Sequence, residues 1–153
     1  MNAVSYNIKP IVIKKEYKHS IEKVFSAFSQ KTAFEQWIAP SDEIGTEVLI
    51  YDFNVGGQYR VKFSVPGFGN MFLSGEFINI NKPNQICFTW VWDKPDIHAG
   101  INSLVTADFF EHEEYTKLVV THENLSTLEA TTRHTQGWNG TLTRLEKHLI
   151  NNA

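Results

Sequence analysis

The chain has 153 residues, a length that suits one domain and hardly allows two. Hydrophobic residues make up 42% of it and its net charge is −3, so it can form a sizeable core and is not a disordered chain. Nucleic-acid-binding proteins usually present a basic surface, which this composition, with a pI near 6.1, excludes. No stretch approaches the roughly 18 consecutive apolar residues of a membrane span, so no membrane insertion is expected.

Cys87 is the only cysteine, which excludes an intramolecular disulfide and a cysteine-based zinc site. It lies between Ile86 and Phe88, where a cysteine usually serves as a small buried hydrophobic residue. The first ten residues lack the basic start and apolar run of a signal peptide. Together these features predict a cytoplasmic protein.

The N-terminal part predicts one strand followed by two short helices. Residues 1–9 are polar and are expected to form a loose tail, whereas residues 11–17 have the pattern of a strand. Ser20 is a suitable N-cap for a helix over residues 21–28, whose apolar residues recur at spacings of three, one and three. A second short helix is expected over residues 31–38, just before a proline.

From Glu47 onward the apolar residues alternate with polar ones, as in half-buried antiparallel strands. The alternation is clear from Tyr59 to Val65, which predicts Tyr59, Val61 and Phe63 on the core side. Short turns separate the strands, so a meander is expected, with a longer polar loop at residues 93–100. The further strands are predicted at about residues 71–80, 85–92, 101–110 and 116–123.

A long helix is predicted at the C-terminus, over about residues 127–150. Residues 126–129, Ser-Thr-Leu-Glu, match a capping box. An apolar stripe follows, formed by Trp138, Leu142, Leu145 and Leu149. Two glycines, Gly137 and Gly140, interrupt this helix, and each costs about 1 kcal/mol against alanine. Glycine is tolerable there where another backbone comes close or where room is needed beside the helix.

The order of strand, two short helices, six strands and long helix resembles the START-like (Bet v 1-like) superfamily. Within it, the chain is similar to the branch of the activator of the Hsp90 ATPase. The resemblance covers roughly residues 11–149 and implies an α+β helix-grip fold, in which a curved antiparallel sheet of six to seven strands wraps around the long helix as a single domain, residues 1–153. The segments that carry it are 21–28, 34–40, 52–59, 75–77, 86–90, 121–125 and 137–145.

These segments are landmarks of the fold and contain no catalytic motif. The superfamily includes binders of lipids and polyketides, cyclases, resistance proteins and co-chaperone domains, so the fold alone does not fix a function. The eukaryotic co-chaperones carry an additional N-terminal domain, for which a chain of 153 residues leaves no room. The resemblance therefore gives little support to Hsp90 activation.

No group of residues predicts a catalytic or metal site. There is no Gly-x-Ser-x-Gly motif and no promising Cys–His pair, so neither a catalytic residue nor a cofactor is assigned. Asp93, Asp96 and His98 are loosely spaced like metal ligands, but no second cluster completes them, which favours a solvated turn. His122 lies on an apolar strand face, as either a structural histidine or a polar anchor and base.

The aromatic content, 13% of the residues, predicts either a filled core or a ring-lined cavity. If a cavity exists between sheet and helix, its opening is expected near the two short helices or the loop at 93–100. The residues predicted to line it are Tyr59, Phe63, Phe88, Trp90, Val105, Val120, His122 and Trp138.

The leading functional prediction is therefore the binding of a small apolar or aromatic molecule by a monomer or homodimer, without catalysis. One alternative is an enzyme acting on such a ligand, such as a cyclase, dehydratase or hydrolase, which needs a protonatable group in the cavity. The other is a chaperone-type interaction domain, which needs an exposed apolar or charged patch elsewhere.

Overall fold

The structure is a computed structural model that describes residues 8–152, so most of the predicted N-terminal tail lies outside the described residues. None of the described helices is long and apolar enough to cross a membrane. The elements of this range, in chain order, are β1 (Ile11–Tyr17), α1 (Ile21–Ser29), α2 (Lys31–Trp37), β2 (Gly45–Tyr51), β3 (Gln58–Val65), β4 (Gly69–Asn81), β5 (Gln85–Trp92), β6 (Ser103–Glu111), β7 (Thr116–Glu123) and α3 (Leu128–Asn151).

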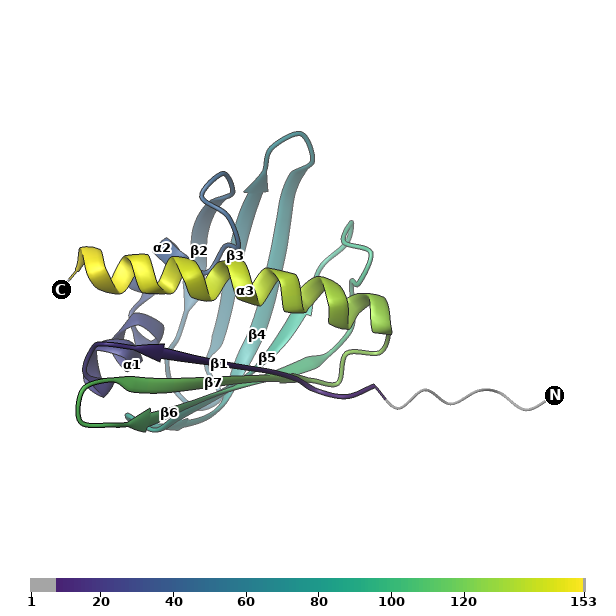
Figure 1. Cartoon of the computed structure of the whole chain (residues 1–153). Coiled ribbons are helices and arrows are strands. Elements are labelled where there is room, and N and C mark those ends of the chain that lie inside the picture. The colour runs from purple at the N-terminus through teal and green to yellow at the C-terminus, as the bar shows by residue number, and fades with distance from the viewer. Residues whose placement is uncertain (1–7, 153) are drawn as a thin grey trace.

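The strands described between residues 8 and 152 form one antiparallel sheet in the order β1-β7-β6-β5-β4-β3-β2. Each strand from β2 to β7 pairs with its neighbour in the chain, whereas β1 pairs with β7, with Ile11 opposite His122 and Tyr17 opposite Thr116. The sheet curves around α3, which crosses its concave side (Figure 1). The predicted α+β helix-grip fold is therefore confirmed.

The alternation of residues in β3 decides which side chains face α3. Tyr59, Val61 and Phe63 are buried, whereas Arg60 and Lys62 are partly exposed on the outer face. The prediction for this strand is confirmed. The outer face carries ion pairs, such as that between Arg60 and Asp93 at 2.8 Å. Because these side chains are partly exposed, such pairs contribute little to stability.

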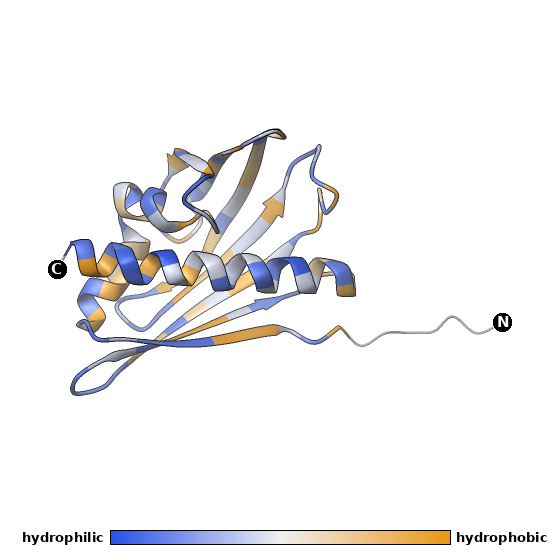
Figure 2. Cartoon of the chain, turned by 45° about the horizontal axis from the view of Figure 1, so that its top comes forward, coloured by the Kyte–Doolittle hydropathy of each residue, from blue (hydrophilic) through white to orange (hydrophobic). Residues whose placement is uncertain are grey.

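The helix α3 begins after Thr127, whose side chain accepts a hydrogen bond from the backbone N–H of Ala130 at 3.0 Å. The capping box pattern would place the N-cap at Ser126, one residue earlier. Hydrophilic and hydrophobic residues are interspersed along α3 in Figure 2, as expected for an amphipathic helix with one apolar side. Its predicted apolar stripe is buried, namely Trp138, Leu142, Leu145 and Leu149.

The C-terminal half of α3 is fixed to the N-terminal elements. The hydroxyl of Tyr17 donates to the carbonyl of Leu142 at 2.9 Å, and the Lys23 ammonium donates to the carbonyl of Leu149 at 2.8 Å. The helices α1 and α2 lie beside this half of α3 (Figure 1). The concave face is therefore covered by three helices at this end and by α3 at the other.

A cluster of aromatic rings fills the space below α1 and α2. Most neighbouring rings meet edge-on or tilted, about 5 to 6 Å apart between centroids, as in Phe28–Phe109 at 5.3 Å, whereas Tyr51 and Phe53 are stacked. Such pairs stabilise a core beyond the apolar area they bury. The rings come from α1, α2 and five strands, with Phe53 beside them: Phe25, Phe28, Phe34, Trp37, Tyr51, Phe53, Tyr59, Phe77, Phe88 and Phe109.

Candidate functional site

A cavity of about 390 Å³, partly open to solvent, lies between α3 and the part of the sheet formed by β3, β4 and β5. Ligand cavities typically measure about 300–1,000 Å³ and have mostly apolar walls with a few polar groups, and this one fits both criteria. Its exposed members Pro40, Arg133 and Gln136 mark the opening. The full lining is Ile38, Pro40, Ile44, Phe63, Val65, Met71, Trp90, Trp92, Asp96, His98, Arg133, His134, Gln136, Gly137, Trp138 and Thr141.

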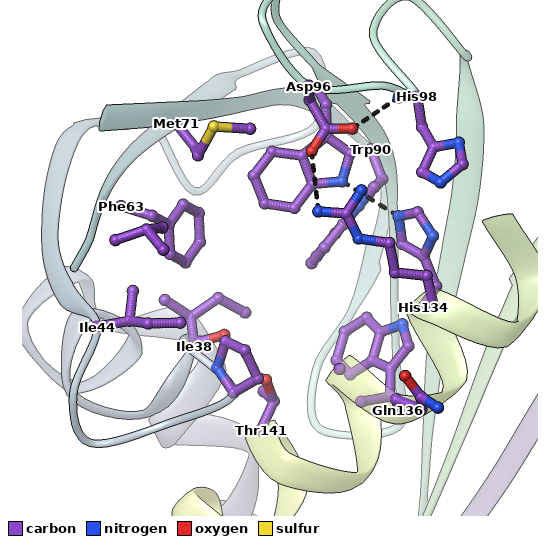
Figure 3. A pocket seen from close by; sticks show the side chains of 16 residues that line it. Ile38, Ile44, Phe63, Met71, Trp90, Asp96, His98, His134, Gln136 and Thr141 are labelled. Carbon is purple, nitrogen blue, oxygen red and sulfur yellow. Dashed lines mark hydrogen bonds and ion pairs between the residues drawn. The ribbon is translucent and has the colours of Figure 1, made fainter. Parts of the chain in front are cut away.

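One side of the cavity is apolar. Figure 3 shows Phe63, Met71, Ile38 and Ile44 turned toward the same space. Phe63 and Met71 are opposite each other in the β3–β4 ladder, so the pairing of these strands places both side chains on the concave face. The two isoleucines belong to the segment between α2 and β2, which therefore forms the second part of this apolar side.

Hydrogen bonds to α3 hold that segment in place. The Thr141 hydroxyl donates to the carbonyl of Ile38 at 3.0 Å. The guanidinium of Arg144 donates to the carbonyls of Ala39 and Gln36, and pairs with Asp42 at 2.8 Å. These contacts satisfy carbonyl groups at the end of α2 and fix the distance between the segment and α3.

The opposite side of the cavity is polar and is formed by the loop 93–100 and the first turns of α3 (Figure 3). Only 5% of the Asp96 side chain is exposed. Its Oδ1 accepts a hydrogen bond from the backbone N–H of His98 at 2.7 Å, and its Oδ2 lies 3.7 Å from Nη2 of Arg133. The buried carboxylate is thus partnered, but its ion pair with Arg133 is longer than a hydrogen bond.

His134 has both ring nitrogens occupied. Nε2 accepts a hydrogen bond from the indole N–H of Trp92 at 3.1 Å, so the proton resides on Nδ1, which donates to the carbonyl of Ala130 at 2.7 Å. Burial lowers the pKa of His134, against a smaller opposite effect of the bond to Ala130. The geometry therefore holds a neutral imidazole in one tautomer.

His122, the predicted polar anchor, lies behind the cavity wall and is fully buried. Its Nδ1 accepts from the indole N–H of Trp138 at 3.0 Å, and its Nε2 donates to the hydroxyl of Ser103 at 2.8 Å. That hydroxyl donates in turn to the carbonyl of Trp90 at 2.8 Å. Burial, with a smaller contribution from nearby His134, lowers the pKa of His122 from 6.5 to about 3. The arrangement is that of a neutral histidine that positions Trp138.

Trp90 forms the centre of the wall and is held by aromatic neighbours. The centroid of its ring lies 5.2 Å from that of Trp138, 5.9 Å from that of Trp92 and 5.5 Å from that of His122. Among the described residues, its Nε1 and the Nε2 of His98 are buried without a hydrogen-bond partner. Buried polar atoms without a partner are uncommon in proteins, and here the surrounding atoms close both nitrogens off from solvent.

Three of the eight residues predicted to line the cavity do line it: Phe63, Trp90 and Trp138. The structure places the other five on the concave side but within the packed interior, namely Tyr59, Phe88, Val105, Val120 and His122. The sequence reasoning missed Met71, Arg133 and His134. Alternation places Trp92 on the same face of the strand as Trp90, but the predicted lining did not include it.

Tyr59 lies in the aromatic cluster and does not line the cavity. Its ring packs against Phe34, Phe77 and Phe88, and its hydroxyl donates to the carbonyl of Thr89 at 2.6 Å. It borders a second hollow of about 410 Å³, which is wider open and lies on the outer face of the sheet. That hollow has fewer apolar walls, so the cavity beside α3 is the better ligand site.

Residues 8–152 contain no group of three His, Cys, Asp or Glu side chains that could hold a metal ion. This range includes Asp93, Asp96 and His98, whose spacing loosely resembled that of metal ligands. In the structure Asp93 pairs with Arg60 on the outer face, whereas Asp96 faces the cavity. The two carboxylates thus serve different surfaces.

The fold and the cavity define a helix-grip protein of the START-like class. Its features are a curved antiparallel sheet around a C-terminal helix, two short helices after the first strand and a cavity against the long helix. The model of the family "Activator of Hsp90 ATPase homolog 1-like protein" matches residues 18–149, and the chain belongs to that family. None of the curated proteins matches the sequence significantly.

Solved structures share this fold at low sequence identity. The AHSA1 protein of Silicibacter pomeroyi is 21% identical, with a TM-score of 0.82 over 94% of this chain and 99% of that one. A protein of Chromobacterium violaceum is 19% identical, with a TM-score of 0.78 over 92% and 96%. A protein of Staphylococcus epidermidis is 20% identical, with a TM-score of 0.79 over 99% and 96%.

Proposed function

We propose that this protein binds a small apolar or aromatic molecule in the cavity between α3 and strands β3–β5. The observation that carries the proposal is the ring-lined wall of Phe63, Trp90, Trp92 and Trp138 around an accessible space of about 390 Å³. Flat aromatic surfaces bury much apolar area in a ligand, and each Å² removed from water contributes roughly 25 cal/mol. Membership of a family with the helix-grip fold is consistent with a ligand-binding domain.

Binding is favoured over catalysis because the histidines nearest the rings are not free to transfer protons. In His122 and His134 each ring nitrogen already has a partner, and indole N–H groups occupy the nitrogens that a base would use. Burial also lowers the pKa of both imidazoles, which weakens them as bases. An enzyme acting on the same ligand would therefore have to use another titratable side chain of the lining, such as Asp96 or His98.

The interaction-domain alternative has little support from the surface. The exposed large hydrophobic side chains in the described part of the chain are scattered over strands, turns and the ends of α3, including Val12, Phe68, Ile97, Phe110 and Ile150. Single exposed hydrophobic residues are normal in monomeric proteins and do not mark an interface.

The proposal includes a cytoplasmic location and a monomeric or homodimeric state. The free thiol of Cys87 supports a reducing compartment. Native mass spectrometry of protein purified from its own host tests the oligomeric state and looks for a co-purifying small molecule at the same time.

Gly137 offers a direct test of the cavity, because a Cβ built on it meets no atom within 4 Å. Gly137→Leu places a branched side chain at the cavity wall, whereas Gly137→Ala adds one methyl group. We expect wild type and Gly137→Ala to bind an apolar naphthalene fluorophore saturably, with quenching of tryptophan emission, and Gly137→Leu to bind it at least about tenfold more weakly.

Circular dichroism controls for folding of both variants. Absence of saturable binding by the folded wild-type protein contradicts the proposal. Equal binding by wild type and folded Gly137→Leu would show that the probe binds elsewhere and would also contradict it.

A further inference from the structure

The cavity has two chemically different ends. The end formed by Ile38, Ile44, Phe63 and Met71 carries no polar side-chain atom apart from the Met71 thioether. The opposite end carries Asp96, His98 and His134, as the close view in Figure 3 shows, and also Arg133, which lies beside Asp96. A ligand that fills the cavity therefore meets an apolar surface at one end and hydrogen-bonding groups at the other.

The charged groups of the polar end compensate each other. Asp96 and Arg133 are the acidic and basic side chains of the lining, and they lie 3.7 Å apart at their nearest atoms. A ligand carboxylate at this end would meet the buried Asp96 carboxylate, and a ligand ammonium group would meet Arg133. Moving either ligand charge out of water costs free energy, and a site whose own charges are already paired offers no free opposite charge to offset that cost.

The polar end contains two buried nitrogens without a partner among the described residues and two charged side chains that line the cavity. Trp90 Nε1 is a donor, and His98 Nε2 is a donor or an acceptor depending on its tautomer. Both residues are at least nine-tenths buried, and neither nitrogen has a partner among residues 8–152. A hydroxyl group both donates and accepts, so it suits the Asp96 carboxylate and the Arg133 guanidinium without bringing a charge into the cavity.

We infer that the ligand is an uncharged amphipathic molecule, with a hydroxyl-type polar group at the Asp96–Arg133 end and an apolar or aromatic body directed toward Ile38 and Met71. This inference rests on the proposed function and deepens it. It predicts a preference among ligands of one shape that differ only in their polar group.

Four naphthalene derivatives with one substituent at position 2 test the inference: the hydroxymethyl compound, the methyl compound, the carboxylate and the aminomethyl compound as its ammonium ion. Titrations at pH 7 with tryptophan quenching give the Kd of each. We expect the alcohol to bind about tenfold more tightly than the methyl compound, the usual size of one net hydrogen bond, and more tightly than both ions.

Two charge-removing variants identify the groups responsible. Asp96→Asn keeps an oxygen for the backbone N–H of His98 but removes the negative charge, so the carboxylate should gain about tenfold in affinity and the ammonium ion should not. Arg133→Gln should favour the ammonium ion in the same way. A merely structural role of either residue would change all four affinities alike.

The outcomes separate this inference from the proposed function. If the methyl compound or either ion binds wild type as tightly as the alcohol does, the inference is overturned while the ligand-binding function stands. If none of the four compounds binds, both are overturned. If the two ions rank in the same order in Asp96→Asn and Arg133→Gln as in wild type, then Asp96 and Arg133 do not form the end of the cavity that meets the polar group of the ligand.

Discussion

The two glycines of α3 occupy opposite environments although they are three residues apart. A Cβ on Gly137 would meet no atom within 4 Å. A Cβ on Gly140 would lie 2.3 Å from the carbonyl oxygen of Pro40 and 3.2 Å from the carbonyl carbon of that residue. Replacing each glycine by alanine therefore adds the same methyl group to the same helix with different consequences.

The expected magnitudes follow from these distances. In a helix interior, alanine is more stable than glycine by about 0.5–1 kcal/mol, so Gly137→Ala should stabilise the protein by that amount. Gly140→Ala has the same intrinsic gain, but the new methyl group must displace the backbone at Pro40. Since overpacking typically costs about 1–3 kcal/mol, Gly140→Ala should be destabilising overall.

The displacement at Pro40 should also disturb its neighbours. The hydrogen bonds from Thr141 to Ile38 and from Arg144 to Ala39 hold the same segment to α3, and they would lengthen together. Because Ile38 and Pro40 line the cavity, Gly140→Ala should weaken ligand binding as well as stability.

Equilibrium unfolding in urea, followed by circular dichroism, measures both variants against wild type. The free energy of unfolding should rise for Gly137→Ala and fall for Gly140→Ala, at unchanged m-values. Equal stabilisation by the two substitutions would mean that α3 does not approach Pro40 closely. Destabilisation by Gly137→Ala would mean that the space beside that glycine is filled.

Three further predictions concern the sheet. Phe63→Ala should cost less than the roughly 3–5 kcal/mol of a fully packed phenylalanine, because the Phe63 ring already borders the cavity, whereas Phe109→Ala should cost that full amount; urea midpoints compare them. Because the pKa of His122 is about 3 when folded and 6.5 when unfolded, the unfolded chain binds the extra proton between these values, and stability falls as the pH drops below 6.5 by up to about 1.4 kcal/mol per unit. His122→Gln, which retains an acceptor and a donor, should flatten the stability difference between pH 7 and pH 5; an unchanged difference would assign it to other groups. Gly75→Ala should prevent folding or cost several kcal/mol, because its Cβ would lie 2.0 Å from the Thr89 carbonyl oxygen and 2.4 Å from the Tyr59 ring, and a folded variant with wild-type Tm would refute this.

The fold was predictable because local patterns determine most of it. The alternation in residues 85–92 and 116–123 gave the bounds of β5 and β7, since apolar residues must share one face of a strand. The apolar spacing of α3 likewise identified its buried side. The start of β2 was placed late, at Glu47 instead of Gly45, because one face of this edge strand is largely exposed and the alternation there is weak.

The candidate site was predictable only in part. Alternation tells which side of the sheet a residue faces, but not how far along the curved sheet it lies from α1 and α2. Phe88 and Trp90 share one face of β5, yet Phe88 packs into the aromatic cluster and Trp90 lines the cavity. Arg133 and His134 were missed because their approach to the loop 93–100 depends on tertiary contacts, such as the bond from Trp92 to His134.

The pairing of β1 with β7 has a consequence for the order of synthesis. During synthesis β1 can pair only when Thr116–Glu123 has been made, whereas the strands between them can form sequential hairpins in the meantime. The helix that crosses the concave face, α3, is made after all of these strands. The part of the apolar face that α3 covers therefore remains exposed until Leu128–Asn151 has been made, and exposed apolar surface makes partly folded chains prone to aggregate.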